Sequence, residues 1–539
     1  MTFALAVKFL VAAAVILIAI SRPAIGEQAF RRIEALLGRF ANRRVVTWLG
    51  LGLLVLLARG VLIPFWPIPT PVIYDEFSYL LQADTFAHGR LTNPTHPLWP
   101  FFEAAYVLQH PTYASKYPPA QSLIMAAGQV LLGHPWFGVW FSCGAMMAAL
   151  VWAMQGWLPP RWALLGGFLA LPVCIVSYWM NSYWGGAVAA VGGALLLGGY
   201  IRVKRGRSAY AIAMGLGIAI LVNTRPYEGL VFSLPISIAY LMSRPRWRSI
   251  ALLAAVLVPA FAATGYYNRA VTGSALQMPF LEYARQYVYI PLFNFQPLQP
   301  TKVYRTMVIY DLHQNWELRE YQKARSWQLI PIRLSDWKDL ASRILGSIVF
   351  GLLIIVFSAD LWRDRRIRLP LFCVIAALAG SLIEVRYYQH YAGPATAALF
   401  IVTVQALRHL RQWKLSGQPA GRFLVRVLPL LLVAAAFEPQ AMMILRQEPQ
   451  PLPANGRRDR IAQSLVEQGG KHVILVHYTG SQSPHEEWVY NSSDIDAQDV
   501  IWANDLGIVE NQKLVDYYKD RKIWRFQPDI NPEWLDPYR

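Results

Sequence analysis

Two adjacent carboxylates, Asp75 and Glu76, are the residues of this sequence best suited to acid–base chemistry. They follow the apolar segment 45–63 and open a polar, aromatic-rich stretch that runs to about residue 119. An acidic pair beside an apolar segment is costly to keep unless it is solvated or used. A solvated pair at a helix start is the simpler interpretation, because carboxylates stabilise helix N-termini. The surrounding residues decide between a solvated pair and a functional one.

Cationic side chains recur in the other short polar stretches that lie on the predicted outer side. Guanidinium groups suit recognition of a lipid phosphate because they donate paired hydrogen bonds. The alternative is a local ion pair, Arg225 with Glu228 or Arg386 with Glu384, that only neutralises its own charge. We predict a donor-phosphate site made by these side chains: Arg386, Arg225, Lys116 and His390.

Aromatic residues accompany these cations. Tyr and Trp at the ends of membrane spans usually form an interfacial belt, which is the alternative interpretation for each of them. We predict that some line a groove for a sugar or lipid, together with one carboxylate: Tyr117, Trp184, Tyr387 and Glu228.

The composition is that of a membrane protein. Of the 539 residues 55% are hydrophobic, and long apolar runs alternate with short basic connectors. The three cysteines all lie in apolar runs and form no metal-type spacing. The sequence therefore predicts a mainly α-helical membrane protein with about twelve transmembrane helices, at 3–20, 45–63, 136–157, 162–179, 185–200, 209–223, 229–243, 250–268, 344–359, 369–384, 391–407 and 423–443.

The net charge of +18 is concentrated in connectors on one predicted side of the membrane. Six connectors hold 23 Lys and Arg residues against four acidic ones: 21–44, 158–162, 201–208, 244–248, 360–368 and 408–426. This distribution follows the positive-inside rule for a multi-pass protein of the cytoplasmic (inner) membrane, so nucleic-acid binding is not needed to explain the charge.

This predicted topology divides the chain into three parts. Residues 1–44 comprise a first span and a cytoplasmic amphipathic helix at 27–41. The first segment could also be a signal-peptide core, although cleavage would leave the following arginines outside. Residues 45–445 form the main transmembrane domain, with large outer loops at 64–135 and 269–343 and a re-entrant or interfacial helix at 119–132. Residues 446–539 form a small soluble α/β domain outside, with helices at 457–468 and 508–519 and strands near 472–478, 487–490, 499–503 and 522–526.

The first outer loop resembles that of the GT-C superfamily of polytopic glycosyltransferases. The resemblance rests on the acidic pair after an early span, on Lys116-Tyr117-Pro118-Pro119, and on Gly133-His134-Pro135-Trp136 after a short helix. The bacterial group of protein mannosyltransferases and lipid A aminoarabinose transferases is the nearest. The resemblance implies a polyprenyl-phosphate sugar donor, a glycan, lipid or protein acceptor, and an extracytoplasmic active site in which Asp75 is the general base and Glu76 its neighbour.

Other functions were weighed against the transferase. There is no P-loop, dinucleotide fingerprint or nucleophile elbow, which argues against an ATP-driven pump. A transporter or lipid-linked-sugar flippase would place charges in mid-span, whereas these lie at span ends. A non-catalytic assembly factor is a third possibility. No metal site is predicted from spacing, and a divalent metal stays possible only through tertiary assembly.

Overall fold

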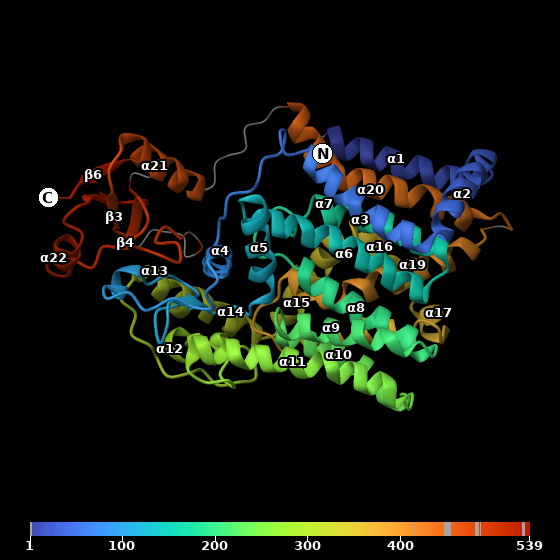
Figure 1. Ribbon diagram of the computed structural model, residues 1–539. Helices are drawn as coiled ribbons and strands as arrows, with labels where there is room; N and C mark the ends of the chain where they lie inside the picture. The colour runs from blue at the N-terminus through green and yellow to red at the C-terminus, as the bar shows by residue number, and fades with distance from the viewer. Residues whose placement is uncertain are drawn as a thin grey trace.

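The structure is a computed structural model that describes residues 3–415, 417–446, 454–479, 485, 487–530 and 534–538. A helical bundle forms most of the molecule, and the C-terminal α/β domain lies at one end of it (Figure 1). The predicted first outer loop, residues 64–135, lies between the two. The mainly helical architecture predicted from the sequence is confirmed.

Each predicted span coincides with a helix of the bundle. These helices are α1 (Phe3–Ser21), α3 (Arg44–Val61), α6 (Trp136–Trp157), α7 (Pro160–Ile175), α8 (Ala187–Lys204), α9 (Ala211–Val222), α10 (Pro226–Met242), α11 (Trp247–Thr272), α16 (Ile348–Val356), α18 (Arg368–Ser381), α19 (Thr396–Gln412) and α20 (Ala420–Arg446). Within the described residues, five are long and apolar enough to cross a membrane alone, and α15 (Leu329–Ile344) with α16, bent by 112°, makes up to six.

Close packing of α8 against the turn after α18 positions part of the candidate site. A Cβ atom added at Gly193 would lie 1.9 Å from the carbonyl oxygen of Pro394, so only glycine fits there. Pro394 belongs to the 3₁₀ helix η4 (Gln389–Ala395). This contact holds the turn that carries Arg386 and His390 against the centre of the bundle.

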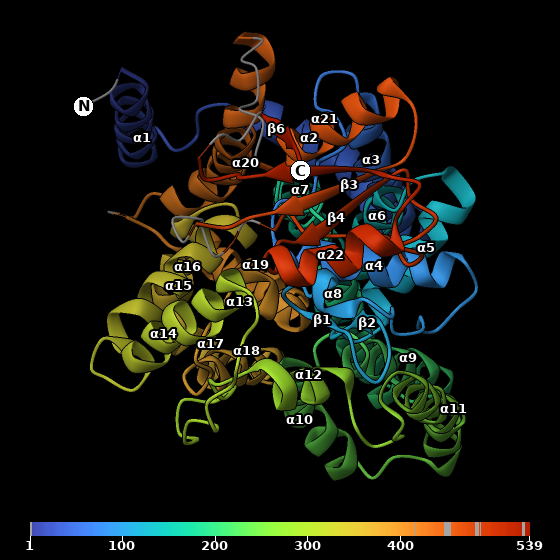
Figure 2. The same ribbon diagram turned by 90° about the vertical axis from the view of Figure 1, so that its left-hand side faces the viewer.

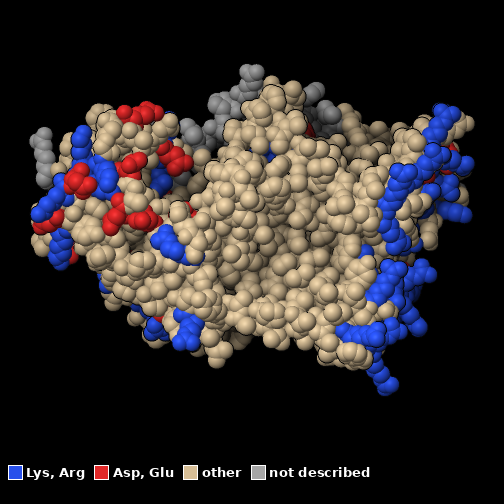
Figure 3. Space-filling model, in the orientation of Figure 1, with Lys and Arg blue, Asp and Glu red and all other residues tan. Residues whose placement is uncertain are grey.

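The basic connectors gather at the end of the bundle opposite the C-terminal domain (Figure 3). The predicted amphipathic helix is α2 (Glu27–Asn42), and α17 (Ser358–Arg363) lies at the same end (Figure 1). On α2, Gly38 and Ala41 are buried, while Ile33 and Leu36 of the apolar face are 52% and 64% exposed.

Two long segments cover the other end of the bundle (Figure 2). The first consists of α4 (Tyr74–Ala87), η1 (Trp99–Phe102), the two-stranded sheet of β1 (Val107–Leu108) and β2 (Ala114–Ser115), and α5 (Ala120–Leu132). The second consists of α12 (Pro279–Tyr287), α13 (Met307–Tyr310), the π-helix η3 (Asp311–Trp316), α14 (Glu317–Ala324) and α15. The short apolar helix predicted at 119–132 is α5.

The C-terminal domain contains a four-stranded sheet in the order β4-β3-β5-β6. Strands β3, β4 and β5 are parallel, and β6 is antiparallel to β5. Its elements are α21 (Ala454–Gln468), β3 (His472–Val476), β4 (Val500–Asn504), α22 (Ile508–Tyr517), β5 (Lys522–Phe526) and β6 (Leu535–Pro537).

The strand predicted at 487–490 is wrong. The guanidinium of Arg458 donates to the carbonyl oxygens of Trp488 at 3.1 Å and Tyr490 at 2.5 Å. These backbone acceptors are therefore satisfied by a side chain rather than by a neighbouring strand.

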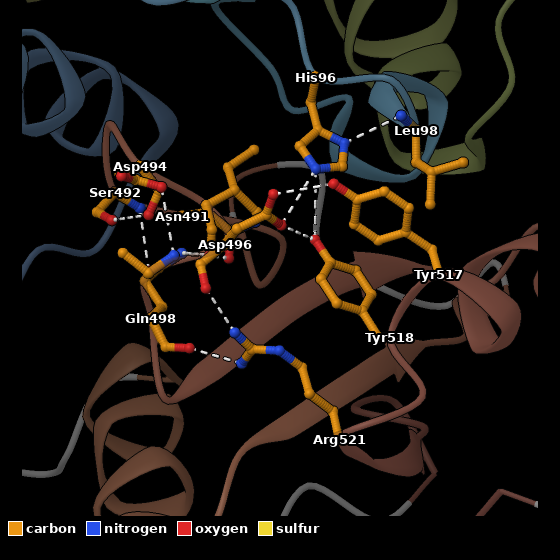
Figure 4. Close-up of polar contacts among 12 residues, drawn as sticks. His96, Leu98, Asn491, Ser492, Asp494, Asp496, Gln498, Tyr517, Tyr518 and Arg521 are labelled. Atoms are coloured by element: carbon orange, nitrogen blue, oxygen red, sulfur yellow. Dashed lines mark hydrogen bonds and ion pairs between the residues drawn. The ribbon is translucent and has the colours of Figure 1, made fainter.

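The C-terminal domain packs on the first outer loop through a shared apolar core and buried polar contacts. Phe101 and Phe102 of η1 lie in one cluster with residues of β3 and β4. Asn504 donates to the carbonyl oxygens of Phe101 and Glu103 at 3.1 and 2.8 Å. His96 of the loop reaches Asp496 at 3.2 Å (Figure 4). The loop that carries Asp75 is thus braced from outside by the C-terminal domain.

Candidate functional site

A cavity of about 500 Å³ lies where these two long segments meet the ends of α10 and α18. Its wall combines several charged groups with a larger number of aromatic and apolar side chains. Seven of the ten predicted site residues line it: Asp75, Lys116, Tyr117, Trp184, Arg225, Glu228 and Arg386.

Asp75 lies in the first turn of α4, half-buried at the cavity wall. The hydroxyl of Tyr117 donates to its Oδ1 atom. Within the described residues its other oxygen, Oδ2, has no hydrogen-bond partner. One carboxylate oxygen is therefore held by the protein while the other is open to a ligand.

Lys116 lies in a cage of aromatic rings. Its Nζ atom is 3.2 Å from the centroid of the Tyr106 ring, and the rings of Tyr117, Tyr283 and Phe280 lie at 5.0, 5.2 and 5.5 Å. Burial lowers the pKa of the Lys116 ammonium to about 7, although nearby carboxylates act in the opposite direction. Within the described part of the chain Lys116 makes no ion pair, so its charge is available to a bound anion.

Arg386 is paired with a buried carboxylate from the second outer segment. Its guanidinium donates to Glu317 at 2.6 Å, and the other oxygen of Glu317 lies 2.8 Å from Nδ1 of His313. Burial alone would raise the pKa of Glu317, but Arg386 and His313 lower it to about 2. Glu317 therefore stays ionised and fixes the position of Arg386 at the cavity wall.

Hydrogen bonds and ring contacts connect this ion pair to Lys116. His313 Nε2 lies 3.1 Å from the hydroxyl of Tyr283, and that hydroxyl accepts from the backbone N–H of Tyr106 at 3.0 Å. Tyr106 has a positive φ of 65°, and its ring contacts Lys116. The two cations are thus positioned by one continuous set of buried groups.

Arg225 and Glu228 lie together at the start of α10. Their charged atoms are 3.8 Å apart, so the predicted local ion pair is present but loose. The guanidinium of Arg225 also lies over the ring of Tyr391, at 4.4 Å. A guanidinium with one loose acid partner keeps donors free for a phosphate.

The remaining three predicted residues do not line this cavity. Glu76 is buried and its carboxylate accepts backbone N–H bonds from Val72, Ile73 and Tyr183 at 2.6, 3.2 and 2.9 Å. Burial raises its pKa to about 7 against these bonds. Glu76 therefore fixes the start of α4 and points away from the ligand space.

His390 and Tyr387 lie behind the wall. His390 is buried, bonds the hydroxyl of Tyr178 at 2.8 Å, and packs on Trp184 with ring centroids 4.6 Å apart. Tyr387 is also buried, and it lines two smaller neighbouring hollows. Both support residues of the wall.

Sequence reasoning missed Glu317, His313 and Tyr106. His313 and Glu317 are spaced i,i+4 on consecutive helical turns, and this spacing was the available indication. Tyr106 has no such pattern, because its place depends on the fold of the whole loop. Within the described residues, no group of three His, Cys, Asp or Glu side chains is arranged to hold a metal ion.

Comparisons with known proteins return solved structures only, since no protein-family model and no curated protein matches the chain. ArnT from Cupriavidus metallidurans in the apo state aligns with a TM-score of 0.49 and 15% identity, over 88% of this chain and 93% of that chain. The same protein bound to undecaprenyl phosphate aligns with a TM-score of 0.49 and 13% identity, over 90% and 93%.

The oligosaccharyltransferase of Archaeoglobus fulgidus, in a complex with Zn and sulfate, aligns with a TM-score of 0.48 and 11% identity. That alignment covers 87% of this chain and 67% of the other. The alignments concern the arrangement of the chain and assign it no activity and no residue role.

Proposed function

We propose that this chain is a membrane glycosyltransferase that moves a sugar from a polyprenyl-phosphate-linked donor to a glycan, lipid or protein acceptor. The observation that carries the proposal is one cavity whose mostly apolar, aromatic wall carries three cations and three carboxylates, Asp75, Glu228 and Glu384. The cations suit a phosphate, the apolar wall suits a prenyl chain, and aromatic rings suit the faces of a sugar.

Asp75 acts as general base in this proposal. Its open oxygen takes the proton from an acceptor hydroxyl while the hydroxyl oxygen forms a bond to the anomeric carbon. The bond from that carbon to the phosphate oxygen breaks, and polyprenyl phosphate leaves with the electron pair. Lys116, Arg225 and Arg386 stabilise the negative charge that develops on the leaving phosphate.

We also propose that the helices form about twelve spans of a cytoplasmic membrane and that the cavity opens on its outer side. The gathering of the basic connectors at the opposite end supports this orientation. A reporter enzyme fused after Arg446 is expected to register outside the cytoplasm. Reporter activity in the cytoplasm would reverse the proposed orientation in the membrane.

The test of the reaction is transfer of a labelled sugar from a synthetic polyprenyl-phosphate donor by the purified full-length protein. Asp75→Asn is expected to lower the rate by about 10²–10⁴-fold, the usual contribution of a general base. Asp339→Asn is the matched control, because Asp339 lies on α15 outside the cavity. Full activity of Asp75→Asn would exclude the base assignment, and flipping of the donor without transfer would favour a flippase.

A further inference from the structure

A second hollow lies at the basic end of the bundle, where α19 ends and α20 begins. Its volume is about 470 Å³. Its wall carries four cationic and two indole side chains: Arg408, Arg411, Lys414, Arg422, Trp162 and Trp413. The proposed transferase reaction uses none of them. We call this hollow the basic-end pocket.

The positive charge of the basic-end pocket is poorly compensated. No acidic side chain lines it within the described residues, and Arg411 and Lys414 form no ion pair with any of those residues, although Glu34 lies close enough to Arg411 to act on it electrostatically. Arg422 lies 3.6 Å from Glu27, but Glu27 also bonds Arg31 at 2.7 Å and pairs with Arg426. Four cations at one wall repel one another unless an anion lies between them.

Other side chains contact two of these cations. The guanidinium groups of Arg408 and Arg411 lie 5.9 and 5.8 Å from the ring of Trp162. Arg408 also donates to Gln405 at 2.8 Å, and Gln405 donates to Asp364 at 2.6 Å. Arg408 is therefore held in place at the wall, while Arg411, Lys414 and Arg422 are exposed around it.

The surroundings indicate where the anion would come from. Helix α2 is tied to the start of α20, because Arg426 donates to Glu34 at 2.8 Å. The same helix exposes Ile33 and Leu36, which are 52% and 64% exposed. An amphipathic helix of this kind lies at the level of lipid headgroups. Basic pockets between helices at that level bind acidic headgroups.

We propose that the basic-end pocket binds the phosphate headgroup of an anionic phospholipid from the adjacent leaflet. The cations would contact the phosphate oxygens, and the two indoles would lie at the border between headgroup and acyl chains. This site is separate from the candidate active site and does not depend on the proposed reaction.

The test compares two double variants of the purified full-length protein by native mass spectrometry with phosphatidylglycerol and phosphatidylcholine. Arg411→Gln/Lys414→Gln removes two charges from the pocket. Arg205→Gln/Arg207→Gln removes two exposed charges at the same end, outside the pocket. We expect the first variant to lose roughly tenfold or more in affinity for phosphatidylglycerol and the second to change less than about twofold.

Three outcomes would overturn the proposal. An equal loss in both variants would show diffuse attraction to the whole basic end, and no loss in either would exclude the pocket. Release of bound phosphatidylglycerol by millimolar inorganic phosphate would identify free phosphate as the ligand instead of a lipid.

A measurement on the wild-type protein covers the case in which the pocket variant does not fold. A photoreactive phosphatidylglycerol is expected to label residues 405–422, in competition with unlabelled phosphatidylglycerol and not with phosphatidylcholine. Equal labelling around Arg205 and Arg207 would contradict the proposal.

Discussion

Lys116 offers the sharpest prediction for the candidate active site, because burial brings its pKa to about 7. In the free protein most Lys116 side chains are charged well below pH 7, half are charged near pH 7, and few are charged well above it. Donor binding requires the charged form if Lys116 contacts the phosphate. Affinity for the donor should therefore be highest below pH 7 and fall as the pH rises through 7.

The size of the effect follows from the protonated fraction. With a pKa of about 7, the charged fraction falls from roughly three quarters at pH 6.5 to roughly 3% at pH 8.5, so the dissociation constant should rise about 25-fold. A phosphodiester keeps one negative charge over this range, so the donor itself does not titrate. Lys116→Arg should make donor affinity nearly independent of pH over this range, because a guanidinium stays charged when buried.

The assay is equilibrium binding of a non-transferable polyprenyl-phosphate sugar analogue between pH 6.5 and 8.5. Binding avoids the separate effect of pH on Asp75 during catalysis. Lys302→Arg is the matched control, since Lys302 is only partly buried, donates to the carbonyl oxygen of Arg285 at 2.8 Å, and lies outside the cavity. A flat wild-type profile, or an equally steep one in Lys116→Arg, would refute the assignment of Lys116 to the donor phosphate.

Three further predictions separate the roles of neighbouring groups. Asp75→Asn should lower the rate of sugar transfer by about 10²–10⁴-fold and leave the unfolding temperature unchanged. Glu76→Gln should instead lower the unfolding temperature, because mispairing one of three buried N–H groups costs about 1–3 kcal/mol. Glu317→Gln should weaken binding of the donor analogue or lower the stability of the protein, because it breaks the buried ion pair with Arg386. The control Glu320→Gln should have a far smaller effect, since Glu320 is a partly exposed partner of Lys323 on the same helix. Asn504→Ala should speed amide hydrogen exchange in residues 99–105, because two buried carbonyl groups there lose their hydrogen-bond donor. Exchange in α8 should stay unchanged.

The sequence predicted the helices well because apolar length and basic connectors are local properties of the chain. It could not predict that α7 and α9 are too short to count as spans by length, because helix ends depend on packing. The strand expected at 487–490 failed for a similar reason. Its periodicity was suitable, but Arg458, about thirty residues earlier, takes its carbonyl groups.

Within the candidate site, the residue types predicted which side chains would lie near one another. They did not predict the direction in which each side chain points. Asp75 and Glu76 are equivalent in the sequence, yet adjacent helical positions point about 100° apart. One carboxylate therefore reaches the cavity while the other accepts backbone bonds. His390 differs from Arg386 in the same way, because the turn they share directs one into the cavity and the other behind Trp184.

The contribution of the C-terminal domain is the point that only the structure reveals. Its contacts reach the first outer loop at two places, through Asn504 to η1 and through Ser493 to Asp84 on α4 at 2.9 Å. Helix α4 also carries Asp75. Loosening the domain should therefore displace the proposed base without touching it, and the variant Asn504→Ala would then lower the rate of transfer more than it weakens donor binding. Equal effects on both would indicate a general loss of folding instead.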